Sequence, residues 1–143
     1  MVMVVFGDDI VKWAYERLPG EIPFDRPIGI GILSGKGVLK GAFVLDGHNR
    51  RSNSITLSIA VEDKKMCTWG VLEWMADYIY NTLGCERLVC NVSSENLASQ
   101  KLCRKFGFKL EGVLRGESAI PGADLMIYGM LKEECHWWSD RDG

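Results

Sequence analysis

Residues 90–115 read CNVSSENLASQKLCRKFGFKLEGVLR, and this stretch contains a complete strand–helix–strand signal. Its first residues are typical of the end of a strand, and Asn96 is a residue type that often caps a helix N-terminus. Gly107 ends the helical periodicity and tolerates the left-handed backbone found after many helices. A new alternating pattern begins at Phe108, which predicts the next strand.

The rest of the chain continues this succession of strands and helices. Helices are expected from Asp8 or Asp9 to Leu18, over 68–83 and over 96–106. Strands are expected at 2–6, 28–33, 38–45, 54–61, 87–92, 108–114 and 125–131, with turns at 34–37, 46–49 and 121–122. The predicted order is therefore β-α-β-β-β-α-β-α-β-β.

The run from Cys90 to Arg115 resembles the C-terminal half of the GNAT superfamily of N-acetyltransferases. It is most similar to the subgroup that acetylates the amino termini of ribosomal proteins. The matching residues fall at the family's spacing: Asn91, Asn96, Ser99, Lys105, Gly107, Phe108, Glu111, Gly112 and Arg115. The resemblance implies one α/β domain over residues 1–143, with a mixed, mostly antiparallel sheet flanked by helices.

Size, composition and charge indicate a globular chain. A length of 143 residues suffices for one well-filled core, and 47% hydrophobic with 25% charged residues is the globular average, which argues against disorder. The net charge of -2 lacks the basic excess of nucleic-acid-binding domains, so no nucleic-acid partner is expected. The N-terminal apolar run is too short to span a membrane, so no membrane association is expected.

The cysteine and histidine pattern predicts a reduced chain without a metal. Five scattered cysteines, with no CxxC pair, are poor material for a disulfide framework and favour a cytoplasmic protein. His48 and His136 lack further ligands at the spacing of a zinc site.

The family resemblance implies acetyl-CoA as the acyl donor. In that family the fourth strand and the strand after the long helix splay apart, and the pantetheine arm binds between them. The residues expected to bind acetyl-CoA are Ile59, Ala60, Val61, Lys64, Lys65, Met66, Cys67, Thr68, Trp69, Asn91, Asn96 and Ser99. A plain central strand explains Ile59 to Val61 equally well, and a plain helix cap explains Asn96.

The loop before the long helix departs from the family's phosphate-binding pattern. Where the family has Arg or Gln, then Gly, then Gly or Ala, this chain has Asp63, Met66 and Thr68. Glycine lets backbone amides approach a phosphate closely, so Met66 makes a tight phosphate nest harder to form. Lys64 and Lys65 either compensate by charge or form an ordinary solvated loop.

Acetyl transfer to an amine requires a base, oxyanion stabilisation and a proton for the departing thiolate. The resemblance implies an oxyanion donor at the backbone N–H of Ala60 or Val61. Cys103 stands where many relatives have the tyrosine that acts as the acid, although a buried core role is favoured. The candidate bases are Glu62, with Asp63 beside it, and the pair Asp46 and His48 on the expected loop after the third strand.

The sequence therefore predicts an N-acetyltransferase that transfers acetyl directly to a primary amine, on a protein N-terminus or a small molecule. The altered loop and Cys103 favour an alternative: an inactive acetyltransferase fold that binds another protein. The Trp137–Trp138 pair marks either the acceptor groove or a protein interface, including that of a homodimer. Acyl length and acceptor identity are open.

Overall fold

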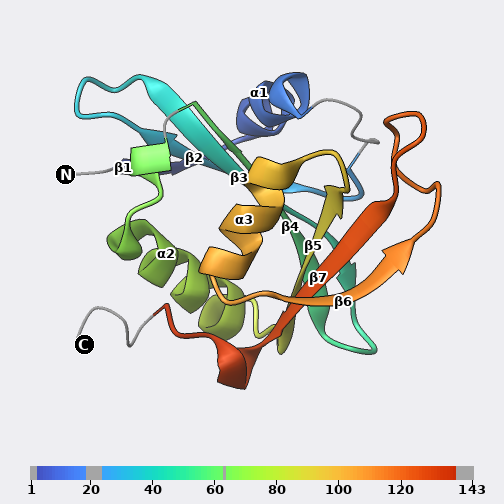
Figure 1. Ribbon diagram of the computed structural model, residues 1–143. Coiled ribbons are helices and arrows are strands. Elements are labelled where there is room, and N and C mark those ends of the chain that lie inside the picture. The colour runs from blue at the N-terminus through green and yellow to red at the C-terminus, as the bar shows by residue number, and fades with distance from the viewer. Residues whose placement is uncertain (1–2, 19–23, 63, 138–143) are drawn as a thin grey trace.

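The computed structural model describes residues 3–18, 24–62 and 64–137. Its strands form one sheet with the order β1-β2-β3-β4-β5-β7-β6 (Figure 1). The strands are β1 (Met3–Phe6), β2 (Ile28–Leu33), β3 (Leu39–Asn49), β4 (Ser54–Val61), β5 (Arg87–Ser93), β6 (Lys109–Leu114) and β7 (Leu125–Leu131). Neighbouring strands are antiparallel except β4 and β5, which are parallel. The predicted mixed, mostly antiparallel sheet is confirmed.

Within the described residues, three α-helices flank this sheet, and several shorter helical turns connect its elements. They are α1 (Asp8–Arg17), α2 (Trp69–Ala76), the π-helix η2 (Asp77–Thr82), α3 (Leu97–Lys105), and the 3-10 turns η1 (Lys64–Met66) and η3 (Lys132–Glu134). The predicted order of strands and α-helices is confirmed. In the part of the chain that the structure describes, no helix is both long enough and apolar enough to cross a bilayer.

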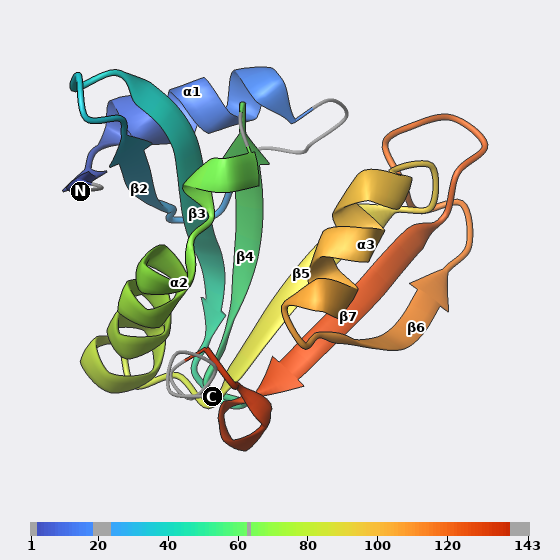
Figure 2. The ribbon, with the colours of Figure 1, turned by 60° about the vertical axis from the view of Figure 1, so that its left-hand side comes forward.

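The helices cover the two faces of the sheet differently. Ile10 and Ala14 of α1 pack against Ala42, Val44 and Ala60 on one face of β3 and β4. The alternate residues of these strands point to the other face, where α2 and α3 pack over a larger core. Figure 2 shows α3 lying along β5 and β7, while α2 lies beside the first half of the sheet.

Three local predictions were wrong. Residues 46–49 were predicted as a turn but continue β3, with an irregular register against β4. Gly47 (φ 61°) takes the left-handed conformation without turning the chain. The turn lies instead at residues 50–53. Helix α1 is capped by Gly7 instead of an aspartate, since the Ile10 amide donates to the Gly7 carbonyl (3.2 Å). Asp8 and Asp9 lie inside the first turn, where carboxylates favour the helix dipole.

The third concerns the predicted helix over 68–83, which divides into α2 and the π-helix η2. The wider turn is closed by the Leu83 amide, which donates to the Tyr78 carbonyl five residues earlier (2.8 Å). Ile79 and Tyr80, which are adjacent in sequence and lie in this turn, are both buried.

Trp137 belongs to the core and forms neither a groove nor an interface. Its side chain is 1% exposed, and its Nε1–H donates to the Phe106 carbonyl (2.8 Å). The ring packs edge-on against Phe106 and at a tilt against Phe108. Trp138 lies outside the described residues, as does Asp63.

Candidate active site

The site begins where β4 and β5 part. The two strands pair only from Ser54 to Thr56 on β4 and from Arg87 to Val89 on β5. Beyond those residues they diverge, and Figure 2 shows the resulting wedge between β4 and β5. The splayed pair of strands, predicted from the family resemblance, is present.

The hydrogen-bond phase of β3 and β4 determines which backbone groups face the wedge. The Glu62 amide donates to the Lys40 carbonyl (3.0 Å), and the Ala42–Ala60 pair lies two residues further along the same ladder. Because hydrogen-bonded pairs alternate in an antiparallel ladder, the backbone groups of Ala60 point toward β3. Those of Ile59 and Val61 point toward the wedge, so of the two predicted oxyanion donors only Val61 has its N–H on the wedge side.

A cavity of about 390 Å³ occupies the wedge. Its lining residues come from both strands, from α3, from the end of α1 and from the β6–β7 loop: Leu18, Leu57, Ser58, Ile59, Cys90, Asn91, Val92, Ser93, Glu95, Asn96, Ser99, Leu102, Cys103, Phe106, Phe108 and Ile120. The walls are largely apolar, with polar groups concentrated at the turn from β5 into α3. Such a lining suits an elongated ligand with amide groups along an aliphatic arm.

A polar network holds the wall formed by β5 and α3. The Asn96 Oδ1 accepts from the Ser99 amide (3.1 Å), which confirms Asn96 as the helix cap. Gln100, 7% exposed, donates from Nε2 to the carbonyls of Ser93 (3.3 Å) and Ser94 (3.1 Å). Its Oε1 accepts from the Tyr128 hydroxyl (3.3 Å). The turn that carries Asn96 and Ser99 is therefore fixed from several directions.

The segment that leads into α2 is held mainly by packing. Thr68 caps α2, since its Oγ1 accepts from the Val71 amide (3.2 Å). The side chains of Met66 and Cys67 pack against the main core. Burial raises the pKa of the Cys67 thiol, and the nearby Lys105 ammonium opposes this shift. Lys65 is exposed in the short turn η1.

Aromatic contacts join this segment to the cavity wall. Trp69, 38% exposed, makes an edge contact with Phe106 at a centroid distance of 6.4 Å. Phe106 lines the cavity, so the first turn of α2 adjoins it. Of the residues expected to bind acetyl-CoA, Ile59, Asn91, Asn96 and Ser99 line the cavity, whereas Ala60, Val61 and the described members of the loop do not.

Cys103 lines the cavity and is also a core residue, as favoured from sequence. Its thiol is hydrogen-bonded to that of Cys90, another buried residue lining the cavity. This bond and burial raise the pKa of Cys90, whereas the bond from Cys90 lowers the pKa of Cys103. Cys103 is thus held toward its neighbour on β5.

The candidate bases lie in different places. Asp46 pairs with Thr56 at the closed end of the wedge, and its pKa is raised by burial. His48 lies beyond that end, where its Nε2 contacts the Asn53 Oδ1 (3.0 Å) and its side chain lines a separate cavity of about 160 Å³. Glu62 is exposed immediately after β4. The structure does not bring His48 to the wedge, whereas Glu62 follows a wedge strand directly.

Several lining residues were missed in the sequence. Leu18 and Ile120 come from segments far from the wedge strands, and no local pattern links them to it. Ser58 follows from the strand periodicity, and Glu95 immediately precedes the predicted cap. Across the described segments, no group of three or more potential metal ligands from His, Cys, Asp and Glu occurs.

Comparisons with known proteins agree with this geometry. The sequence model of the acetyltransferase (GNAT) domain matches residues 24–109. A search of curated proteins by sequence found no match. Among solved structures, the fold is similar to mutant forms of the spermidine/spermine N-acetyltransferase SpeG from Vibrio cholerae, with a TM-score of 0.78, 15% identity and 100% of both chains covered. A dodecameric spermidine N-acetyltransferase from Vibrio cholerae gives a TM-score of 0.77 at 14% identity, covering 97% of each chain.

These solved structures share the fold at low identity, and the family model covers more than half of the sequence. That span includes both wedge strands and the whole of α3. This chain therefore belongs to the GNAT acetyltransferase family.

Proposed function

We propose that this chain is an acetyl-CoA-dependent N-acetyltransferase that transfers the acetyl group directly to a primary amine. The observation that carries this proposal is the wedge: β4 and β5 separate after Thr56 and Val89 and leave a cavity beside an unpaired strand edge. Backbone groups of Ile59 and Val61 are available there to the amides of a pantetheine arm. Acetyl-CoA, when bound, supplies the activated thioester.

The remaining roles follow from position. Val61 N–H is the proposed oxyanion donor, and Asn91, Asn96 and Ser99 form the polar side of the arm's site. The segment Lys64–Trp69 is the proposed phosphate site, because it leads into the N-terminus of α2. Glu62 is the proposed base through water, with Cys103 as the acid. The acceptor class is a protein N-terminus, as in the ribosomal-protein subgroup, or a small molecule.

A second candidate is an acetyltransferase fold that binds a protein without catalysis. Two features favour it: Met66, which stands at a glycine position of the family pattern, packs against the core, and the Cys103 thiol is engaged with Cys90. Such a protein would keep the wedge without using it for acetyl transfer.

Calorimetric titration with acetyl-CoA separates the two candidates. Saturable binding, together with acetylation of a primary amine detected by released thiol, is expected. Absence of binding at millimolar acetyl-CoA would overturn the enzyme and leave the binding protein.

Cavity-directed variants test the location. Ser99→Trp fills the cavity and should weaken binding on the order of 100-fold, because an overpacked site cannot accept the arm. Lys101→Trp, on the exposed side of α3, is the matched control. Asn96→Ala removes the cap and the amide, whereas Asn96→Asp keeps the cap. If both Asn96 variants weaken binding equally, the amide itself contacts the ligand.

The phosphate role of the loop has its own test. The Lys64→Ala/Lys65→Ala double variant should weaken acetyl-CoA binding more at low salt than at high salt. The Arg50→Ala/Arg51→Ala variant removes two neighbouring cations from the β3–β4 turn and serves as control. Equal affinities in both double variants would remove the phosphate role from this segment.

A further inference from the structure

The cavity carries one negative charge, at one end. Among the described residues that line it, Glu95 alone has a charged side chain. Glu95 precedes α3 at the wide end of the wedge, where Ser93 also contributes to the lining. Leu18, which immediately follows α1, and Ile120, in the β6–β7 loop, add apolar surface to the same cavity.

Positive charge lies at the other end of α3. Lys105 is the last residue of this helix and acts electrostatically on Cys67, in the segment before α2. The contact between Trp69 and Phe106 confirms that the C-terminal end of α3 adjoins that segment. At 1.5 Å per residue, about 13 Å of helix separates the two ends. Lys105 thus lies at the end of α3 that adjoins α2, and Glu95 lies at the opposite end, just before α3 begins.

The turn that carries Glu95 is held in place. The Glu95 amide donates to the Ser93 Oγ (3.3 Å), which also accepts from the Ser118 hydroxyl (3.0 Å). Next to it, the Ser94 amide donates to the Asp124 carbonyl (2.8 Å), and the Asp124 amide donates to the Ser94 Oγ (2.9 Å). The β6–β7 loop and the β5–α3 turn thus form one braced rim that sets the position of Glu95.

We propose that Glu95 selects acceptors that carry a second positive charge, of the class of aliphatic di- and polyamines. This inference rests on the proposed function, because the attacking nitrogen of an amine acceptor must be deprotonated. The charge that a carboxylate attracts must then sit on a second group that stays protonated during the reaction. Leu18 and Ile120 would contact the methylene chain between the two nitrogens. The end of α3 that carries Lys105 would lie toward the anionic phosphates of acetyl-CoA.

The test is titration calorimetry of 1,4-diaminobutane and of n-butylamine into the full chain saturated with CoA. Variants are Glu95→Gln and, as a control with the same charge change, Glu133→Gln in the exposed turn η3. The Glu95→Gln variant should bind the diamine about 5- to 10-fold more weakly, the range of one charge-assisted contact at an exposed site. Its affinity for n-butylamine, which lacks the second charge, should be unchanged.

Three outcomes would overturn the inference: no diamine binding, equal diamine affinities in the two variants, or an equal loss for diamine and monoamine in Glu95→Gln. Failure of the proposed function is read separately, from absent acetyl-CoA binding or from absent acetylation of any amine by the wild-type chain. In steady state, the same selection should appear as a raised KM for the diamine with kcat unchanged.

Discussion

The two turns that lead from the wedge strands into helices are held in place by different interactions. The turn from β5 into α3 is capped by Asn96, and the segment from β4 into α2 is capped by Thr68. Around Asn96 the backbone carbonyls and hydroxyls are tied by a polar network, whereas Met66 and Cys67 fix the other segment by burying side chains. The first turn combines rigidity with polar groups at the cavity, whereas the second is held by side chains packed against the core.

The largest expected effect is at Trp137, whose buried ring packs against Phe106 and Phe108 after the end of α3. Trp137→Ala should lower the free energy of unfolding by about 3–5 kcal/mol, because a fully buried ring is lost beside Phe106. Trp137→Phe keeps most of the volume but leaves the Phe106 carbonyl without its donor, which costs about 1–3 kcal/mol. Urea denaturation measures both variants, and Trp69→Ala, which removes a partly exposed ring that also contacts Phe106, is the comparison. Equal losses of stability in Trp137→Ala and Trp69→Ala would show that the buried Trp137 ring contributes no more to the fold than the partly exposed Trp69 ring.

The next effect is on the network of the α3 wall. Gln100→Met conserves size but removes the donor to the Ser93 and Ser94 carbonyls and the acceptor for Tyr128. Partners left unsatisfied in a buried site cost about 1–3 kcal/mol. Acetyl-CoA affinity should fall as well, since the turn that carries Asn96 loosens. A variant that loses stability but binds acetyl-CoA as tightly as the wild type would separate the network from the site.

In the segment that leads into α2, a substitution that lowers stability should raise the acetyl-CoA affinity instead of lowering it. Met66→Gly removes a half-buried side chain and adds backbone freedom, so the free energy of unfolding should fall by about 1–2 kcal/mol. Acetyl-CoA affinity should rise several-fold, because glycine lets backbone amides approach a phosphate. Met66→Ala is the control, with a similar loss of packing and without the backbone freedom. If affinity falls in both variants, Met66 supports the site and the second candidate function loses its main argument.

Residues with local causes were predictable from sequence, and residues brought together by the sheet were not. Asn96 and Gly107 act through their own backbone surroundings, so the start and end of α3 could be placed. The phase that turns Val61 toward the wedge and Ala60 away from it depends on pairing with β3, which no local pattern encodes. Likewise, the extension of β3 past Gly47 depends on its partner strand, and His48 moved out of the candidate site with it.

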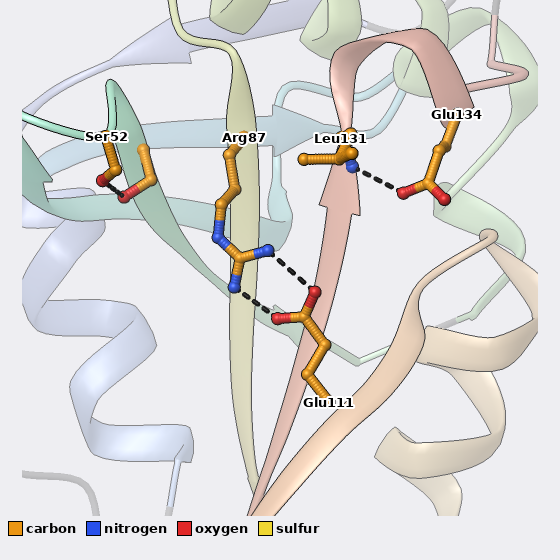
Figure 3. A network of polar contacts seen from close by, with 6 residues as sticks. Ser52, Arg87, Glu111, Leu131 and Glu134 are labelled. Carbon is orange, nitrogen blue, oxygen red and sulfur yellow. Dashed lines mark hydrogen bonds and ion pairs between the residues drawn. The ribbon is translucent and has the colours of Figure 1, made fainter.

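The smallest effect is expected at the ion pair between Arg87 on β5 and Glu111 on β6, away from both turns (Figure 3). The bidentate hydrogen bond from Arg87 lowers the pKa of Glu111. A carboxylate whose pKa is lower in the folded state stabilises the fold at pH values above its ordinary pKa of 4.5, and this stabilisation is lost as the pH falls through the folded-state pKa.

Because Glu111 is partly exposed, solvent screening limits the contribution of the ion pair to about 0.5 kcal/mol. Glu111→Gln should therefore be slightly less stable than wild type at pH 7, and the difference should shrink as the pH falls below 4.5, measured by urea denaturation. Glu117→Gln, in the exposed β6–β7 loop, is the control. A Glu111→Gln deficit that stays the same size as the pH falls would show that Glu111 contributes by covering Gly129 rather than by its charge.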